Sequence, residues 1–87
     1  MPDSQEPTAA QKLVGDMAPK LGALTDDVLF GDVWKREGLS PRDRSLITIA
    51  TLIAGGNTDQ LTAHLGIGQT NGLTQDEIGE VITHLAF

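Results

Sequence analysis

Residues 40–56 read Ser-Pro-Arg-Asp-Arg-Ser-Leu-Ile-Thr-Ile-Ala-Thr-Leu-Ile-Ala-Gly-Gly, and this stretch decides the fold. Ser40 is a good N-cap, Pro41 suits the first helical position, and Asp43 places a carboxylate at the third, a variant of the capping box. The pattern predicts a helix that ends at Gly55-Gly56. Its later half is apolar on nearly all sides, which predicts burial on every side. A chain of 87 residues is too small to cover this helix alone, so we expect subunit contacts to complete its burial.

Two further helices are predicted after this one. Asn57 or Thr58 caps the first, which runs through Asn71, and Gly72 then takes the position at which glycine commonly ends helices. Thr74-Gln-Asp-Glu77 is a standard capping box and begins the second. The apolar residues of this last helix form one stripe: Ile78, Val81, Ile82, Leu85 and Ala86.

The segment before residue 40 also shows helical spacing. Residues 9–24 carry apolar side chains at that spacing, and Pro19 is predicted to kink or split the helix they form. A short second helix is predicted from Thr25, a good N-cap followed by two aspartates, to Gly38.

No segment of useful length alternates with period two, so the predicted fold is all-α, a compact helical bundle with an antiparallel hairpin around Gly72. We expect residues 1–8 to be a disordered lead-in and residues 9–87 to form one helical domain. The last helix reaches Phe87 without a stop signal, so the domain is expected to be truncated there. A chain of this size is marginal alone, since it buries only about 60–65% of its unfolded surface.

Composition excludes several classes of protein. The chain has no cysteine and only two histidines, which rules out disulfides and thiol chemistry and argues against a metal site. A net charge of −6 argues against nucleic acid as a partner. The N-terminus does not resemble a signal peptide and no apolar run is long enough to cross a membrane, so we expect a soluble, cytoplasmic protein that associates with itself.

Several stretches, in chain order, resemble the carboxymuconolactone decarboxylase family. The resemblance covers roughly residues 13–87 and implies the helical fold shared with alkylhydroperoxidase D-like proteins, assembled as trimers or hexamers. The stretches are Asp27-Val-Leu-Phe-Gly-Asp-Val-Trp34, Gly38-Leu-Ser-Pro-Arg-Asp-Arg-Ser-Leu-Ile47, Leu61-Thr-Ala-His64, Asn71-Gly-Leu-Thr-Gln-Asp-Glu-Ile78 and His84-Leu-Ala-Phe87.

The redox residues of that fold family are missing here. In the thiol-dependent relatives a Cys-x-x-Cys pair precedes a histidine by four residues, and a glutamate lies on the previous helix. Matched through His64, the cysteine positions fall at Asn57 and Gln60, and the glutamate falls near Ser45. Amide side chains cannot form a thiolate or a sulfenate, so the sequence excludes thiol peroxidase activity.

The resemblance instead implies a carboxy-lyase that decarboxylates 4-carboxymuconolactone in aromatic-acid breakdown by the β-ketoadipate route. No metal or organic cofactor is implied, and the expected ligand is a small anionic lactone or organic acid. The alternative is a non-redox relative without catalysis, a helical oligomer that binds a small organic acid.

Two residues are the predicted catalytic groups. His64 is interpreted as a proton donor or orienting group, against the alternative of an inert histidine at the edge of the apolar stripe. Arg44 is interpreted as the group that binds a substrate carboxylate, against the alternative of an ordinary salt bridge to Asp43 or Glu37. Arg42 is expected to face solvent.

Two more residues are predicted to bind substrate. His84 has the alternative of an exposed charge pair with Glu80, one turn earlier on the same helix. Trp34 has the alternative of packing, with Phe30 four residues before it.

Overall fold

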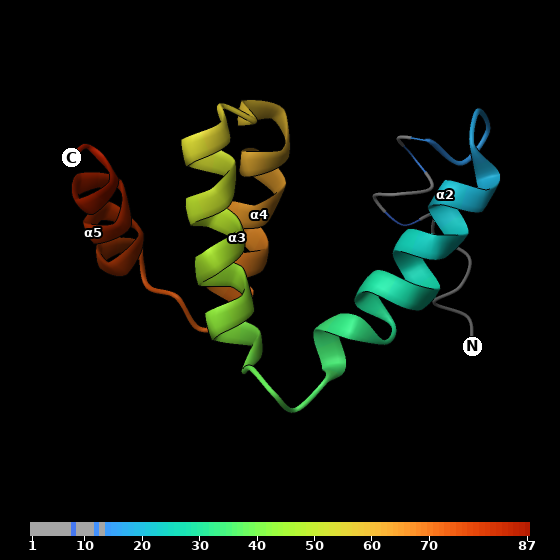
Figure 1. Cartoon of the computed structure of the whole chain (residues 1–87), viewed down its shortest axis with the longest axis horizontal. Helices are drawn as coiled ribbons and strands as arrows, with labels where there is room; N and C mark the ends of the chain where they lie inside the picture. The colour runs from blue at the N-terminus through green and yellow to red at the C-terminus, as the bar shows by residue number, and fades with distance from the viewer. Residues whose placement is uncertain (1–7, 9–11, 13) are drawn as a thin grey trace. The chain divides into compact units, whose positions relative to one another are not determined.

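The computed structural model describes Thr8, Lys12 and residues 14–87. In this part of the chain the regular structure is helical throughout, with four α-helices and no strand, so the all-α prediction is confirmed. The predicted lead-in, apart from Thr8, lies outside the described residues. The elements are α2 (Pro19–Ala23), η2 (Leu24–Phe30), η3 (Val33–Lys35), α3 (Pro41–Gly55), α4 (Thr58–Thr70) and α5 (Gln75–Leu85) (Figure 1).

The chain divides into two compact units, Met1–Glu37 and Gly38–Phe87. In the first, α2 begins with Pro19 at its first turn, so this proline does split the apolar segment around it. The helix then continues directly into η2, a π-helical segment. The prediction of a new helix capped by Thr25 is wrong, because the Thr25 hydroxyl donates to the Leu21 carbonyl at 2.8 Å within the continuing helix.

The end of the first unit also differs slightly from the prediction. After η2, the 3₁₀ turn η3 ends at Lys35, and Arg36 is already extended, with φ −69° and ψ 148°. Helical structure therefore stops before Gly38, where the sequence placed its end.

In the second unit the capping signals are confirmed. The Ser40 hydroxyl accepts the Asp43 N–H at 3.0 Å, and α3 ends at Gly55 with Gly56 as its C-cap, whose φ of 73° is left-handed. Thr74 and Glu77 form a complete capping box at the start of α5. These local hydrogen bonds define the ends of the helices independently of how the helices pack.

The end of α4 is a Schellman motif. The Leu73 N–H donates to the Gly68 carbonyl at 2.9 Å, and the Gly72 N–H donates to the Gln69 carbonyl at 3.1 Å. Gly72 has a φ of 109°, which L-residues rarely adopt. Asn57 is the N-cap of the same helix, although no side-chain hydrogen bond caps it.

The core of the second unit lies around Ile49 in the middle of α3. Ile49, Leu73 and Ile78 are 0, 3 and 8% exposed. Helix α3 packs against both α4 and α5, whereas α4 and α5 make few contacts with each other. The prediction that α4 and α5 form a packed hairpin around Gly72 is therefore wrong. Leu73, between the two helices, is buried in the core with Ile49 of α3, so both helices pack on α3. The partly buried residues around this core are Leu46, Ile53, Leu61, Leu65 and Val81.

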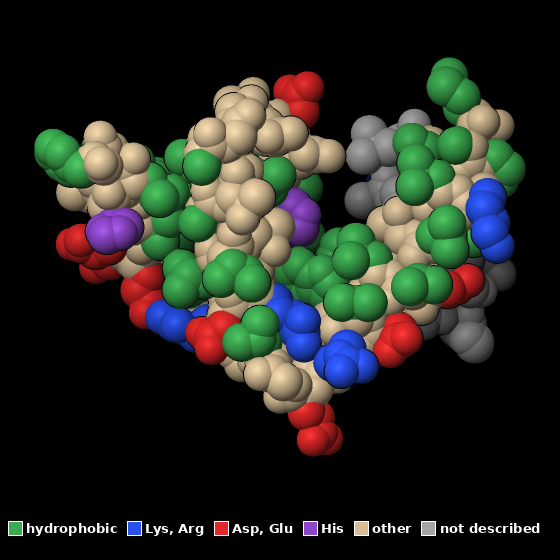
Figure 2. Space-filling model, viewed as in Figure 1, with side chains coloured by type: hydrophobic (Ala, Val, Ile, Leu, Met, Phe, Trp, Pro, Cys, Tyr) green, Lys and Arg blue, Asp and Glu red, His purple; other side chains and the backbone are tan. Residues whose placement is uncertain are grey.

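Helix α3 is not buried on every side within one chain. Ile47 on its outer side is 55% exposed, and Ile82 on α5 is 53% exposed. Hydrophobic side chains are visible at the molecular surface in the space-filling view (Figure 2). A single chain therefore leaves part of α3 uncovered, as expected for a chain of this size, and burial of the rest at subunit contacts stays a prediction. In the part of the chain described, no helix combines the length and apolar character needed to cross a membrane.

Candidate active site

The two predicted catalytic residues lie on the two helices that pack most extensively in the second unit. Arg44 is in the first turn of α3 and His64 is in the middle of α4. Both residues are half-buried, and the Nε of Arg44 and the Nδ1 of His64 are buried atoms. The helices thus hold a cation and an imidazole partly withdrawn from water in the same unit.

A polar contact joins the start of α3 to the residue that follows α4. Ser45, next to Arg44, is fully buried, and its hydroxyl accepts the Asn71 side-chain N–H at 2.9 Å. Asn71 follows α4 directly, and His64 lies seven residues before it. Seven residues correspond to about 10 Å of helix axis. Arg44 and His64 are therefore offset by about two helical turns along the packed helices.

The protonation state of His64 follows from its burial. Desolvation lowers the pKa of the imidazole from its usual value of 6.5. The ring is therefore mainly neutral at pH 7. In this form one ring nitrogen carries a proton, and the other is able to accept a hydrogen bond. A neutral imidazole is suited to donating a hydrogen bond to a developing oxyanion, and less suited to delivering a full proton.

The positions that match the lost redox residues carry ordinary polar side chains. Asn57 and Gln60 are exposed and line a shallow depression of about 300 Å³ at the start of α4. Ser45, at the glutamate position, is enclosed in the core beside Gly68 and Ile49. The sequence had not predicted that Asn71 would contact this serine, since the two are 26 residues apart.

His84 borders a groove on the α5 side of α3. It is exposed on α5 and borders an open, apolar groove of about 300 Å³ between α3 and α5. Neither predicted catalytic residue lines that groove. The structure thus does not bring His84 to them. The groove is lined by Leu46, Ala50, Glu80, Val81, His84 and Leu85.

Trp34 belongs to the first unit. Its ring contacts that of Phe30 at a centroid distance of 5.4 Å and an interplanar angle of 39°. This is the packing contact that the spacing of the two aromatics suggested as the alternative.

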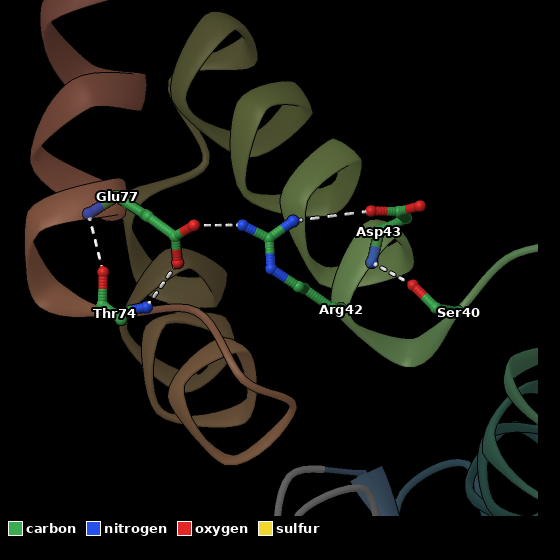
Figure 3. Close-up of polar contacts among 5 residues, drawn as sticks. All are labelled: Ser40, Arg42, Asp43, Thr74 and Glu77. Carbon is green, nitrogen blue, oxygen red and sulfur yellow. Dashed lines mark hydrogen bonds and ion pairs between the residues drawn. The ribbon is translucent and has the colours of Figure 1, made fainter.

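The expectation that Arg42 faces solvent is incomplete, because its side chain contacts two carboxylates. Its guanidinium donates through Nη2 to Glu77 at the start of α5, and its Nη1 lies 3.7 Å from the Asp43 carboxylate (Figure 3). The backbone hydrogen bond from Thr74, and then the contact with Arg42, lower the pKa of Glu77 below its usual value of 4.5. No sequence pattern places residues 42 and 77 side by side.

In the part of the chain that the structure describes, no group of three histidine, aspartate or glutamate side chains is arranged to hold a metal ion. The candidate site would combine the Arg44 guanidinium, the neutral imidazole of His64 and the buried Ser45 hydroxyl.

The second unit is thus an all-helical domain that carries Arg44 and His64 on two packed helices. Its sequence contains no cysteine for thiol redox chemistry. Residues 19–87 match the carboxymuconolactone decarboxylase family, and the chain belongs to this family. The resemblance predicted from the sequence is thereby confirmed.

Two characterised relatives are similar to part of the chain. One is the 4-carboxymuconolactone decarboxylase of Acinetobacter baylyi, 49% identical over 55 residues, which is 63% of this chain and 41% of the relative. The other is a nitrosuccinic acid decarboxylase of Metarhizium robertsii, 37% identical over 57 residues, which is 66% of this chain and 40% of the relative. The chain therefore spans about two fifths of the length of these relatives. No solved structure matches it significantly.

Proposed function

We propose that this protein is a carboxy-lyase that removes carbon dioxide from a carboxylated γ-lactone of the 4-carboxymuconolactone type, a reaction of aromatic-acid breakdown. The observation that carries the proposal is the 49% identity to a 4-carboxymuconolactone decarboxylase. In the structure, Arg44 and His64 are both half-buried, and they lie on two helices that pack against each other. The second relative also bears the name of a decarboxylase that acts on a small organic acid.

Arg44 is the group proposed to bind a substrate carboxylate. A guanidinium remains charged at all relevant pH values and matches a carboxylate with two parallel hydrogen bonds. Partial burial strengthens such a contact, because the surrounding dielectric is lower than that of water. The cation also keeps the substrate in place while the reacting carboxylate loses its charge as carbon dioxide.

His64 is proposed to stabilise the charge that develops on the lactone. When the carbon–carbon bond to the leaving carboxylate breaks, its electron pair passes into the unsaturated lactone and places negative charge on the carbonyl oxygen. The N–H of a neutral imidazole donates to that oxygen, and solvent then supplies the proton at carbon. Such a donor contributes a factor of about 10²–10³ in rate.

Self-association is part of the proposal. Ile47 and Ile82 expose more than half of their surface in one chain, and the chain is small for an independent domain. A homo-oligomer, of the trimeric or hexameric kind expected from the family, would cover such side chains. Sedimentation at micromolar concentration tests this point, and a stable folded monomer there would contradict it.

The experiment for the activity is a decarboxylation assay with 4-carboxymuconolactone, followed by absorbance. His64→Ala is expected to lower kcat/KM by about 10²–10³. Because the neutral imidazole is the active form, kcat/KM of the wild type should fall as pH drops through the lowered pKa of His64 and stay level above it. A rate that instead rises toward acid pH would show that the imidazolium is the active form.

Nitrosuccinic acid is the comparison substrate, because the second relative is named for it. Turnover of nitrosuccinic acid with no turnover of the lactone would keep the carboxy-lyase class and replace the substrate. Inactivity on both, together with saturable binding of either acid, would favour the non-catalytic binding protein.

A further inference from the structure

The first turn of α3 carries Arg44, and its position depends on few backbone hydrogen bonds. The Arg44 N–H donates to the Ser40 carbonyl at 3.0 Å, the first such bond of the helix. The turn before it relies on the Ser40 hydroxyl, which accepts the Asp43 N–H. Because the first N–H groups of a helix lack partners within it, this turn frays most readily. Fraying would displace Arg44.

The same turn has an electrostatic cost. Arg42 and Arg44 are both cations at the end of the helix where the macrodipole is positive. Asp43 offsets part of this charge, with its carboxylate 3.7 Å from the Arg42 guanidinium. Another helix also contributes compensation, through the contact between Arg42 and Glu77.

Glu77 is itself held in a defined position. One of its carboxylate oxygens accepts the Thr74 N–H at 2.9 Å, and its own N–H donates to the Thr74 hydroxyl at 3.1 Å. The other carboxylate oxygen accepts from Arg42 (Figure 3). The capping box of α5 thereby fixes the position of the Glu77 carboxylate. This carboxylate accepts from Arg42 in the first turn of α3.

We propose that Arg42 and Glu77 form a clamp that positions Arg44 for binding a substrate carboxylate. This inference rests on the proposed function for the role of Arg44, and it adds two positioning residues that do not themselves touch the substrate. Through the clamp, α5 holds in place the turn of α3 that carries the Arg44 guanidinium.

The clamp is suited to experiment because its contribution to global stability is small. The side chains of Arg42 and Glu77 are 40 and 42% exposed, and ion pairs this exposed add little to the free energy of folding. Variants of either residue are therefore expected to fold. Their effect should appear in the placement of Arg44.

Glu77→Gln is the sharpest variant. Glutamine retains an oxygen for the Thr74 N–H, as capping boxes with glutamine do, but it loses the charge that faces Arg42. Asp76→Asn is the matched control, since it removes one charge from an exposed position in the same turn. With 4-carboxymuconolactone as substrate, Glu77→Gln should raise KM by about 2–30-fold and change kcat little. Asp76→Asn should change neither.

A double-mutant cycle shows whether the effect passes through Arg44. If the clamp acts by positioning Arg44, Glu77→Gln should raise KM in the wild-type background and have no further effect in an Arg44→Lys background. Effects on KM that multiply in the double variant would overturn the proposal, because they would show that Glu77 acts independently of Arg44.

A second readout does not need the reaction. The Nε of Arg44 is buried, so its N–H should exchange slowly with water and be observable by ¹⁵N-edited NMR. Glu77→Gln should accelerate this exchange, and Asp76→Asn should leave it unchanged. Unchanged exchange in Glu77→Gln would overturn the clamp even in an active enzyme. Faster exchange in a protein without lyase activity would support the clamp and reject the proposed function.

Discussion

Replacing Gly68 with alanine tests the packing of α4 against α3. A Cβ atom at Gly68 would lie 2.9 Å from Cδ1 of Ile49 and 3.1 Å from Cδ1 of Leu73. Ordinary carbon contacts begin at about 3.5 Å, so these atoms must retreat by about 0.4–0.6 Å. Both belong to core side chains, which are 0 and 3% exposed, and have little room to move.

Two opposing effects set the magnitude for Gly68→Ala. Alanine favours a helix over glycine by about 1 kcal/mol, and overpacking a core costs about 1–3 kcal/mol. The net change should lie between none and about 2 kcal/mol of destabilisation. Gly66 on the same helix is the matched control, because a Cβ there meets nothing within 4 Å. Gly66→Ala should stabilise by about 1 kcal/mol.

The assay is thermal unfolding followed by circular dichroism at one protein concentration. The two variants should differ by about 1–3 kcal/mol. For a domain of this size each kcal/mol shifts Tm by about 4–8 °C, with Gly66→Ala melting higher. Equal stabilisation by the two alanines would refute the close approach of α4 to the core at Gly68.

Three further predictions concern the Ser45 contact, the Glu77 carboxylate and the absence of cysteine. Ser45→Ala should destabilise by about 1–3 kcal/mol in chemical denaturation, because it removes the acceptor for the Asn71 side chain; an unchanged midpoint would show that this contact is dispensable. Since folding lowers the pKa of Glu77, its stabilising contribution should be complete above pH 4.5 and lost as pH falls through the folded pKa, and Glu77→Gln should reduce this acid sensitivity in pH-dependent unfolding. The protein should show no thiol-dependent turnover of hydrogen peroxide, since it contains no cysteine; robust turnover would contradict the reading of the site.

The parts of the fold that the sequence predicted correctly are those determined by local hydrogen bonds. The caps at Ser40 and Thr74 and the glycine end at Gly72 involve residues within a few positions of one another. Thr25 has the same side-chain chemistry as a cap, but a hydroxyl within a helix can instead donate to the carbonyl four residues earlier. A single-sequence pattern does not distinguish these two outcomes.

The contacts that the sequence did not predict join residues far apart in the chain. Arg42 and Glu77 are separated by 35 positions, and Ser45 and Asn71 by 26. Each side chain on its own is compatible with solvent exposure. Their pairing depends on how α4 and α5 pack on α3, which periodicity alone does not define.

His64 and Arg44 remain predictions as site residues. The sequence identified His64 through its place in the family pattern, and Arg44 through its charge in the first turn of a capped helix. The structure adds their partial burial and the lowered pKa of the imidazole. Those properties depend on packing around α3 and α4, which no local motif encodes.

The enclosure of Ser45 has a consequence for engineering this scaffold. Cysteines introduced at Asn57 and Gln60 would occupy exposed positions and would be tolerated readily. A glutamate at position 45 would instead place a longer, ionised side chain in a space now filled by a hydroxymethyl group, beside Ile49 and Gly68. Burying that charge without a partner is strongly unfavourable. A route back to peroxide chemistry from this sequence would therefore require the core to be enlarged before the carboxylate is restored.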